Sequence, residues 1–156
     1  MFNGPLPLTS TFTVLQSKQV HILLVEDDPL DVATITGALH DREGETVIHV
    51  AHDAEKALDM LQGNGQPALV PTPQIILLNL KSSEQDSMSF LKELRQDSRL
   101  RFCSVFIMTN QSTKEDIQKA YSFNVAGYII KPIQHDSFLE CLATLHSYWN
   151  LIELPY

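Results

Sequence analysis

Acidic, hydroxyl and basic side chains stand at the ends of separate apolar runs in this sequence. Glu26 and Asp27 follow the first such run, and Thr109 and Lys131 end two later ones. Oxygen-rich sites with adjacent carboxylates are the kind that Mg²⁺ prefers. A lysine and a threonine placed nearby could bind the oxygens of a phosphoryl group. The chemistry that these residue types suggest is therefore phosphate and divalent-cation chemistry.

The segments around these residues alternate between short apolar runs and amphipathic stretches. The apolar runs predict strands at 20–27, 46–51, 74–79, 104–109 and 127–131. Helical periodicity predicts helices at 28–40, 53–62, 84–97, 112–124 and 135–149. This alternation predicts an α/β fold with a parallel sheet covered on both faces.

The helix starts carry capping signals. Asp28 before Pro29, and Asp53 before the second helix, are expected caps, and Ser112 with Glu115 predicts a capping box. In parallel sheets, sites gather at the carboxyl ends of strands. That rule selects six residues: Glu26, Asp27, Asp28, Asn79, Thr109 and Lys131.

Length and composition limit the classes of function. The 156 residues are enough for one domain, and a net charge of −8 disfavours binding to nucleic acid or to anionic membranes. Cys103 and Cys141 are expected to be core residues in a cytoplasmic protein. The histidines have no metal-ligand spacing, and surface or capping roles are expected for all six: His21, His40, His49, His52, His135 and His146.

The ordered set of motifs resembles the receiver domain of the two-component response regulator family, over residues 20 to about 148. The resemblance implies a flavodoxin-like, doubly wound sheet of five parallel strands in the order 2-1-3-4-5, with five helices. We expect an irregular lead-in at 1–18, a receiver-like domain at 19–148 and an apolar extension at 149–156. The motifs that carry the resemblance are the acid pair Glu26 and Asp27, the hydroxyl of Thr109, the switch aromatic Tyr128, and Lys131 followed by Pro132, which is a cis-proline candidate.

At position 79 the resembled family has an aspartate that takes a phosphoryl group from a histidine kinase. Its Mg²⁺ would be held by Asp27, by the acceptor and by the backbone carbonyl of Lys81. Here the residue is Asn79, and an amide cannot serve as the attacking carboxylate. Ser83 and Ser87 also depart from the pattern. We therefore expect a pseudo-receiver with no cofactor, a weak or absent Mg²⁺ site, and Lys131 paired with Asp27.

The C-terminal segment carries an apolar stripe at helical spacing, and an exposed stripe of this kind usually marks an interface. It resembles the extended C-terminus of the single-domain regulators of cyanobacterial phytochromes, which implies a homodimer. The alternative is a tail folded back on its own core. The candidate interface residues are Phe138, Leu142, Leu145, Tyr148, Trp149, Ile152 and Leu154.

These observations favour a non-enzymatic signalling module that acts by contact with a sensor histidine kinase or another signalling protein. The alternative is a phospho-accepting response regulator seen as an Asp-to-Asn variant at Asn79. A flavodoxin-like enzyme or flavin carrier is disfavoured, because "EDDPLD" is acidic where a flavin phosphate would sit.

Overall fold

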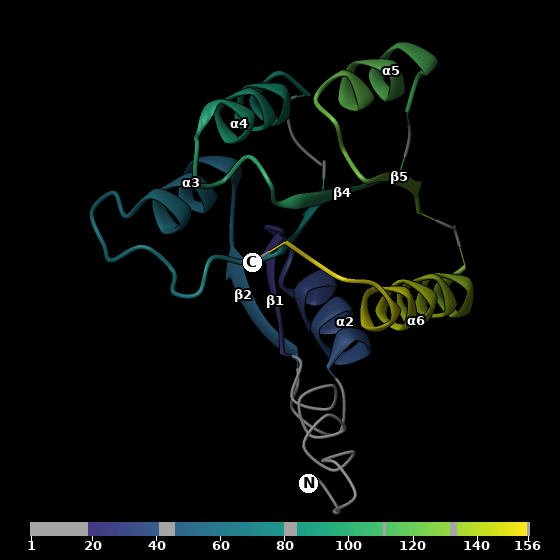
Figure 1. The fold of residues 1–156 in the computed structure, drawn as a ribbon. Helices are drawn as coiled ribbons and strands as arrows, with labels where there is room; N and C mark the ends of the chain where they lie inside the picture. The colour runs from purple at the N-terminus through teal and green to yellow at the C-terminus, as the bar shows by residue number, and fades with distance from the viewer. Residues whose placement is uncertain (1–18, 41–45, 80–83, 111, 132–133, 156) are drawn as a thin grey trace, which may run out of the picture.

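The computed structural model describes residues 19–40, 46–79, 84–110, 112–131 and 134–155. Its centre is a sheet of five parallel strands in the order β2-β1-β3-β4-β5 (Figure 1). The sequence prediction of a doubly wound sheet is confirmed. The strands are β1 (Val20–Val25), β2 (Thr46–Ala51), β3 (Ile75–Asn79), β4 (Ser104–Thr109) and β5 (Gly127–Ile130).

Helices cover both faces of the sheet. In Figure 1, α3, α4 and α5 lie on one side of the strands, and α2 and α6 lie on the other. The bounds are α2 (Pro29–Leu39), α3 (Ala54–Gln62), α4 (Glu84–Gln96), α5 (Lys114–Ser122) and α6 (His135–Leu151). Within the described parts of the chain, none of these helices is long and apolar enough to cross a membrane.

Alternate side chains of β1 enter two separate cores. Leu23 packs with residues of α3, α4 and α5, whereas Ile22 and Leu24 pack with residues of α2 and α6. All three side chains are fully buried. Each contributes about 1.5–3 kcal/mol through burial of apolar surface. Because both faces are covered, the central strands are apolar throughout and polar residues are left to their ends.

Two of the predicted helix caps are confirmed. The Leu30 backbone N–H donates to Asp28 Oδ1 over 2.9 Å, and the Lys56 N–H donates to Asp53 Oδ1 over 2.8 Å. The predicted capping box at the start of α5 is wrong by one residue, because Thr113 is the N-cap and Asp116 completes the box.

The C-terminal stripe is largely part of the core, so its assignment to a dimer interface is wrong for its most buried members. Trp149 is 1% exposed, and its ring meets Phe106 edge to face at 5.3 Å between centroids. Phe138 and Leu142 are buried in the same cluster, and Leu145 and Leu154 pack against it. The stripe is apolar because the chain's own sheet and α2 cover it.

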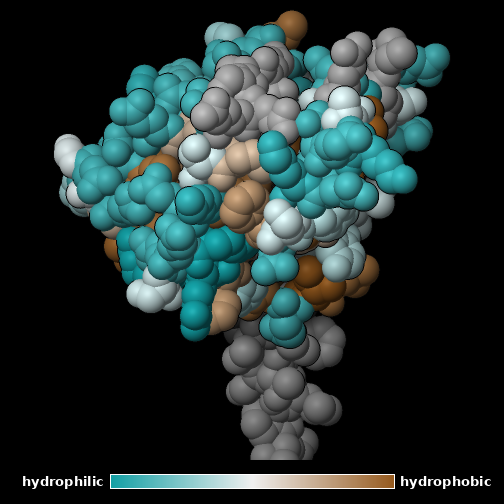
Figure 2. Space-filling view, turned by 90° about the horizontal axis from the view of Figure 1, so that it is seen from above, coloured by the Kyte–Doolittle hydropathy of each residue, from teal (hydrophilic) through white to brown (hydrophobic). Residues whose placement is uncertain are grey.

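The C-terminal end of α6 also carries apolar side chains that are exposed to solvent. Tyr148 is 49% exposed and Leu151 is 84% exposed, whereas Ile152 is half-buried. Seen from above, most of the molecular surface is hydrophilic, with apolar groups in small areas between polar ones (Figure 2). The candidate interface therefore shrinks to a few residues at the end of α6.

One arginine joins two connecting segments of the fold. The Arg95 guanidinium, at the end of α4, donates to the backbone carbonyls of Phe123 and Asn124 after α5. It also donates to those of Arg101 and Cys103 before β4. A planar, forked donor suits such a multiple contact. Sequence reasoning missed this role.

A further correction concerns two histidines expected at the surface, of which His21 is buried and His49 is half-buried. His21 is 8% exposed, and its ring stacks on that of His49 with 5.8 Å between centroids. Burial lowers the pKa of His21, and the facing His49 lowers it further. Burial likewise lowers the pKa of His49. The cysteines are both free; Cys103 is buried, as expected, and Cys141 is half-buried.

Candidate functional site

The carboxyl ends of the strands bring the predicted site residues to one edge of the sheet. Asn79 and Thr109 are the last residues of β3 and β4. Glu26 follows β1, and Lys131 follows β5. Val25 pairs with Leu78 across β1 and β3, and neighbouring strands lie about 4.8 Å apart. The residues at the ends of β1 and β3 therefore lie at the same edge of the sheet.

The three acids after β1 have three different environments. Glu26 is 2% exposed, and its Oε1 accepts a hydrogen bond from the Asp28 backbone N–H over 3.1 Å. Asp28 is half-buried and caps α2. Asp27 is exposed. Of the three carboxylates, Asp27 is therefore the most accessible to a ligand from solvent.

The amide of Asn79 is buried at the end of β3. Neither its oxygen nor its nitrogen has a hydrogen-bond partner within the part of the chain that the structure describes. Leaving a buried polar group unsatisfied costs about 1–3 kcal/mol, so such groups call for an explanation. Lys81 and Pro132, which the sequence analysis assigned to the metal site and to a cis peptide, lie outside the described residues.

The predicted ion pair between Lys131 and Asp27 is wrong. Lys131 Nζ lies 3.6 Å from Asp31 Oδ2, in the first turn of α2. The ammonium also lies 5.7 Å from the centroid of the Phe138 ring. Lys131 pairs with Asp31 because Asp31 lies in the first turn of α2, near the lysine. Asp27 precedes this helix and is exposed to solvent.

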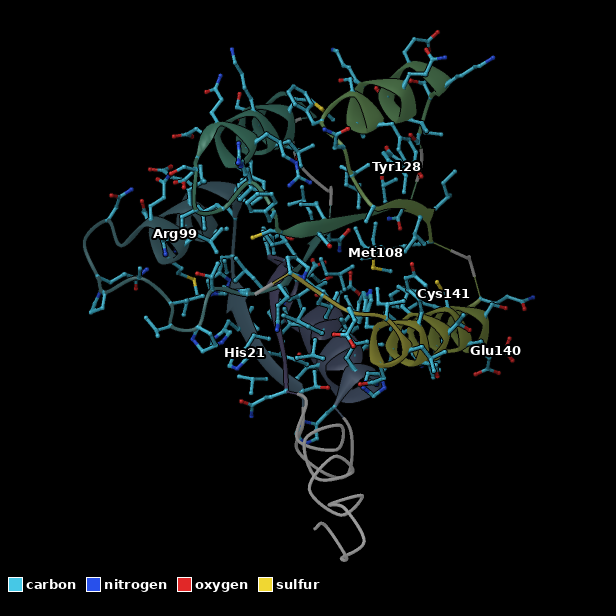
Figure 3. All side chains as sticks on the ribbon, in the orientation of Figure 1. His21, Arg99, Met108, Tyr128, Glu140 and Cys141 are labelled. Atoms are coloured by element: carbon cyan, nitrogen blue, oxygen red, sulfur yellow. The ribbon has the colours of Figure 1, made fainter. Side chains whose placement is uncertain are left out.

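The hydroxyl and the aromatic residue of the predicted site lie on neighbouring strands. Thr109 is 6% exposed, and its carbonyl accepts from the Lys131 backbone N–H over 2.7 Å. Tyr128 packs partly against the core beneath α3, α4 and α5, and Figure 3 shows it on the side of the sheet that faces α5. Its hydroxyl lies 2.6 Å from Ser112 Oγ. Tyr128 is thus tied to the segment that leads into α5.

The described residues of this edge do not make a Mg²⁺ site by themselves. Nowhere in the described ranges do three or more His, Cys, Asp or Glu side chains form a group that could hold a metal. The buried, unpaired amide of Asn79 brings an oxygen without charge, and Lys131 is directed to Asp31. Hard divalent cations are held best by several charged oxygens, so this donor set fits Mg²⁺ poorly.

A parallel sheet in this order, with acidic, hydroxyl and lysine side chains at its carboxyl edge, defines a receiver-type signalling domain. The model of the response regulator receiver domain family matches residues 22–143. The chain belongs to this family. The probable methanogenesis regulatory protein FilR2 of Methanothrix harundinacea (strain 6Ac) is 31% identical over 132 residues, which span 82% of each protein.

Two further relatives are regulators with solved structures. Response regulator Rcp1 of Synechocystis sp. (strain ATCC 27184 / PCC 6803 / Kazusa) is 26% identical over 86% of this chain and 92% of its own length. The crystal structure of its Mn²⁺-bound form superposes with a TM-score of 0.76 at 24% identity, over 88% of this chain and 99% of that one. The phosphorylated cyanobacterial phytochrome response regulator RcpA gives a TM-score of 0.81 at 25% identity, with the same coverage. This chain is therefore similar to a cyanobacterial phytochrome response regulator and to a response regulator whose Mn²⁺-bound form is known.

Proposed function

We propose that this protein is a pseudo-receiver, which signals by contact with other proteins and without phosphorylation of the residue at the end of β3. The single observation that supports this proposal is the residue type at that position. Asn79 ends β3 at the same sheet edge as Glu26 and Thr109. A carboxylate there could attack a phosphoryl group, whereas an amide carries no charge and is a poor nucleophile.

A phosphorylation assay with two proteins tests the proposal. The natural chain and its Asn79→Asp variant are each incubated with acetyl phosphate and Mg²⁺, and intact masses are measured. We expect a phosphoryl adduct on the variant alone. An adduct on the natural chain, at any residue, would contradict the proposal and favour a phospho-accepting regulator.

The proposed partner is a sensor histidine kinase or another signalling protein. The similarity to RcpA, a phytochrome response regulator, supports this choice. Recognition would not depend on phosphoryl transfer, so the natural chain should bind the kinase as tightly in the absence of ATP as in its presence. Affinity that requires ATP would count against the proposal.

We also propose that two copies associate through the end of α6, with no enzymatic step in the function. Tyr148 and Leu151 are the exposed apolar residues that support this contact. The remaining candidate residues are buried or partly buried: Phe138, Leu142, Leu145, Trp149, Ile152 and Leu154. Light scattering of the natural chain and of Leu151→Asp at micromolar concentration tests it. A monomeric mass for both proteins would exclude the dimer.

A further inference from the structure

Two histidines of the neighbouring strands β1 and β2 bring their ring nitrogens together. His21 and His49 are 28 residues apart in the sequence, but the parallel register pairs His49 with Leu23, two residues after His21. Alternate residues of a strand point to the same face, so the two histidines lie on one face of the sheet. His21 Nδ1 is 3.5 Å from His49 Nε2. The fold therefore places together two imidazole nitrogens that the spacing in the sequence did not connect.

The backbone of His21 is held on both sides by Gln74. The His21 N–H donates to Gln74 Oε1 over 2.8 Å, and the Gln74 N–H donates to the His21 carbonyl over 3.1 Å. His21 is 8% exposed, whereas His49 is half-buried on β2, which is an edge strand of the sheet. The pair is thus fixed on the side of β1 and partly open to solvent on the side of β2.

A further hydrogen bond determines which nitrogen of His21 carries the proton. His21 Nε2 lies 3.2 Å from Gln19 Oε1, and an amide oxygen only accepts hydrogen bonds. In the neutral ring the proton is therefore on Nε2, and Nδ1 faces His49 with its lone pair. Histidines that bind metals nearly always donate from their second ring nitrogen to an oxygen in this way. His21 Nδ1 is thus prepared to act as a metal ligand.

The separation of the two nitrogens fits a tetrahedral metal ion. Two Zn²⁺–N bonds of about 2.0–2.1 Å that end on nitrogens 3.5 Å apart enclose an angle of roughly 115–120°, close to the tetrahedral value of about 109°. In a square-planar ion, adjacent nitrogens would be about 2.9 Å apart and opposite ones about 4.1 Å apart. Mg²⁺ prefers oxygen ligands. The ligand type and the spacing therefore favour Zn²⁺.

We propose that His21 Nδ1 and His49 Nε2 bind one Zn²⁺ ion between them. The ion takes the place of the proton between the two rings after a small rotation of each, and the His49 ring then carries its proton on Nδ1. Water completes the coordination, because no group of three His, Cys, Asp or Glu side chains that could hold a metal occurs among the described residues.

The expected affinity is moderate. A site with two protein ligands binds Zn²⁺ less tightly than a structural site with four, so we expect a dissociation constant of about 10–100 µM. The net charge of −8 attracts cations to the chain as a whole. The proposal does not depend on the proposed signalling function, because His21 lies at the start of β1 and the candidate functional site lies at the carboxyl ends of the strands.

Titration of the full chain with zinc chloride, in a buffer without chelators, tests the proposal. Calorimetry gives the affinity and the stoichiometry, and nitrogen-15 chemical shifts of the imidazole rings identify the ligand atoms. We expect saturation at one ion per chain, with the largest changes at His21 Nδ1 and His49 Nε2, and no such changes with magnesium chloride. No saturation by about 1 mM Zn²⁺, one ion per two chains, or changes confined to other histidines would overturn the proposal.

Three variants make the test specific to this pair. His21→Gln and His49→Gln should each weaken Zn²⁺ binding by at least about tenfold, because one imidazole is left to hold the ion. His52→Gln, at an exposed histidine just after β2, is the matched control and should leave binding unchanged. An equal loss in all three variants would mean unspecific binding to surface histidines and would contradict the proposal. If circular dichroism shows that His21→Gln does not fold, the comparison of His49→Gln with His52→Gln decides.

Discussion

Lys131 Nζ and Asp31 Oδ2 lie 3.6 Å apart and join the end of β5 to the first turn of α2. The lysine side chain is 9% exposed and the aspartate side chain is 29% exposed. An ion pair in this environment is screened less than one on the surface. The lysine at this edge of the sheet thus has a carboxylate partner within the chain.

The first prediction follows from this pair. Asp31→Asn should lower the free energy of unfolding by about 1–2 kcal/mol, because it leaves a nearly buried ammonium facing a neutral group. This loss in the free energy of unfolding is smaller than for a fully buried ion pair, because the carboxylate is partly exposed to solvent. Urea denaturation at pH 7 measures the change. Asp136→Asn in the exposed first turn of α6 is the control, and an equal effect there would contradict the role of the pair.

The second prediction concerns divalent cations. We expect the natural chain to bind Mg²⁺ with a dissociation constant above about 1 mM, because the donor set at the end of β3 has one charge too few. Asn79→Asp should tighten binding by at least about tenfold, since a carboxylate close to the cation adds Coulomb attraction of several kcal/mol before desolvation is subtracted. Calorimetric titration with Mg²⁺ measures the dissociation constants of both proteins. Sub-millimolar binding by the natural chain would show that the amide suffices.

The third prediction separates the core of α6 from its surface. Trp149→Ala should destabilise the protein by about 3–5 kcal/mol, because a large buried ring is removed from its contact with Phe106. Tyr148→Ala, one residue earlier and half exposed, should cost less than about 1 kcal/mol. Chemical denaturation of both variants gives the comparison. Similar losses would mean that Trp149 is not the core residue of the pair.

The fourth prediction is a pH dependence. Burial, and for His21 also the facing His49, lowers the pKa of both rings in the folded protein. The unfolded chain therefore takes up protons more readily, so stability is complete above the ordinary histidine pKa of about 6.5 and falls as the pH drops below it. His21→Gln should make the denaturation midpoint less sensitive to acid.

The control for this prediction is His135→Gln, a change at the exposed start of α6. It should leave the loss of stability between pH 7.5 and pH 5 as large as in the natural chain. If both variants flatten the profile equally, the stacked pair is not the group that responds to acid.

The fold could be predicted because its physical signals are local. Apolar, β-branched runs fixed the bounds of β2 and β4 to the residue, and Asp53 marked the start of α3. The location of the site also followed, since element order alone places the ends of parallel strands at one edge. What these signals share is that each depends on neighbours in sequence.

The incorrect predictions concern side chains whose contacts are made with residues distant in the sequence. Several acids near the strand ends could have paired with Lys131, and the sequence does not show that α2 places Asp31 beside it. Ser112 and Thr113 are adjacent and equally suited to cap α5, but Ser112 is held by Tyr128, sixteen residues away. The apolar stripe ending at Trp149 has the same period whether a partner or the chain's own sheet covers it.

The bonds of Arg95 have a mechanical consequence for any partner that pushes on α5. The turn after that helix and the turn before β4 share one guanidinium. Because both turns accept hydrogen bonds from the same guanidinium, a displacement of one turn should be accompanied by a displacement of the other. A displacement of α5 would therefore be felt first in the segment between α4 and β4, which lies away from the residues at the strand ends.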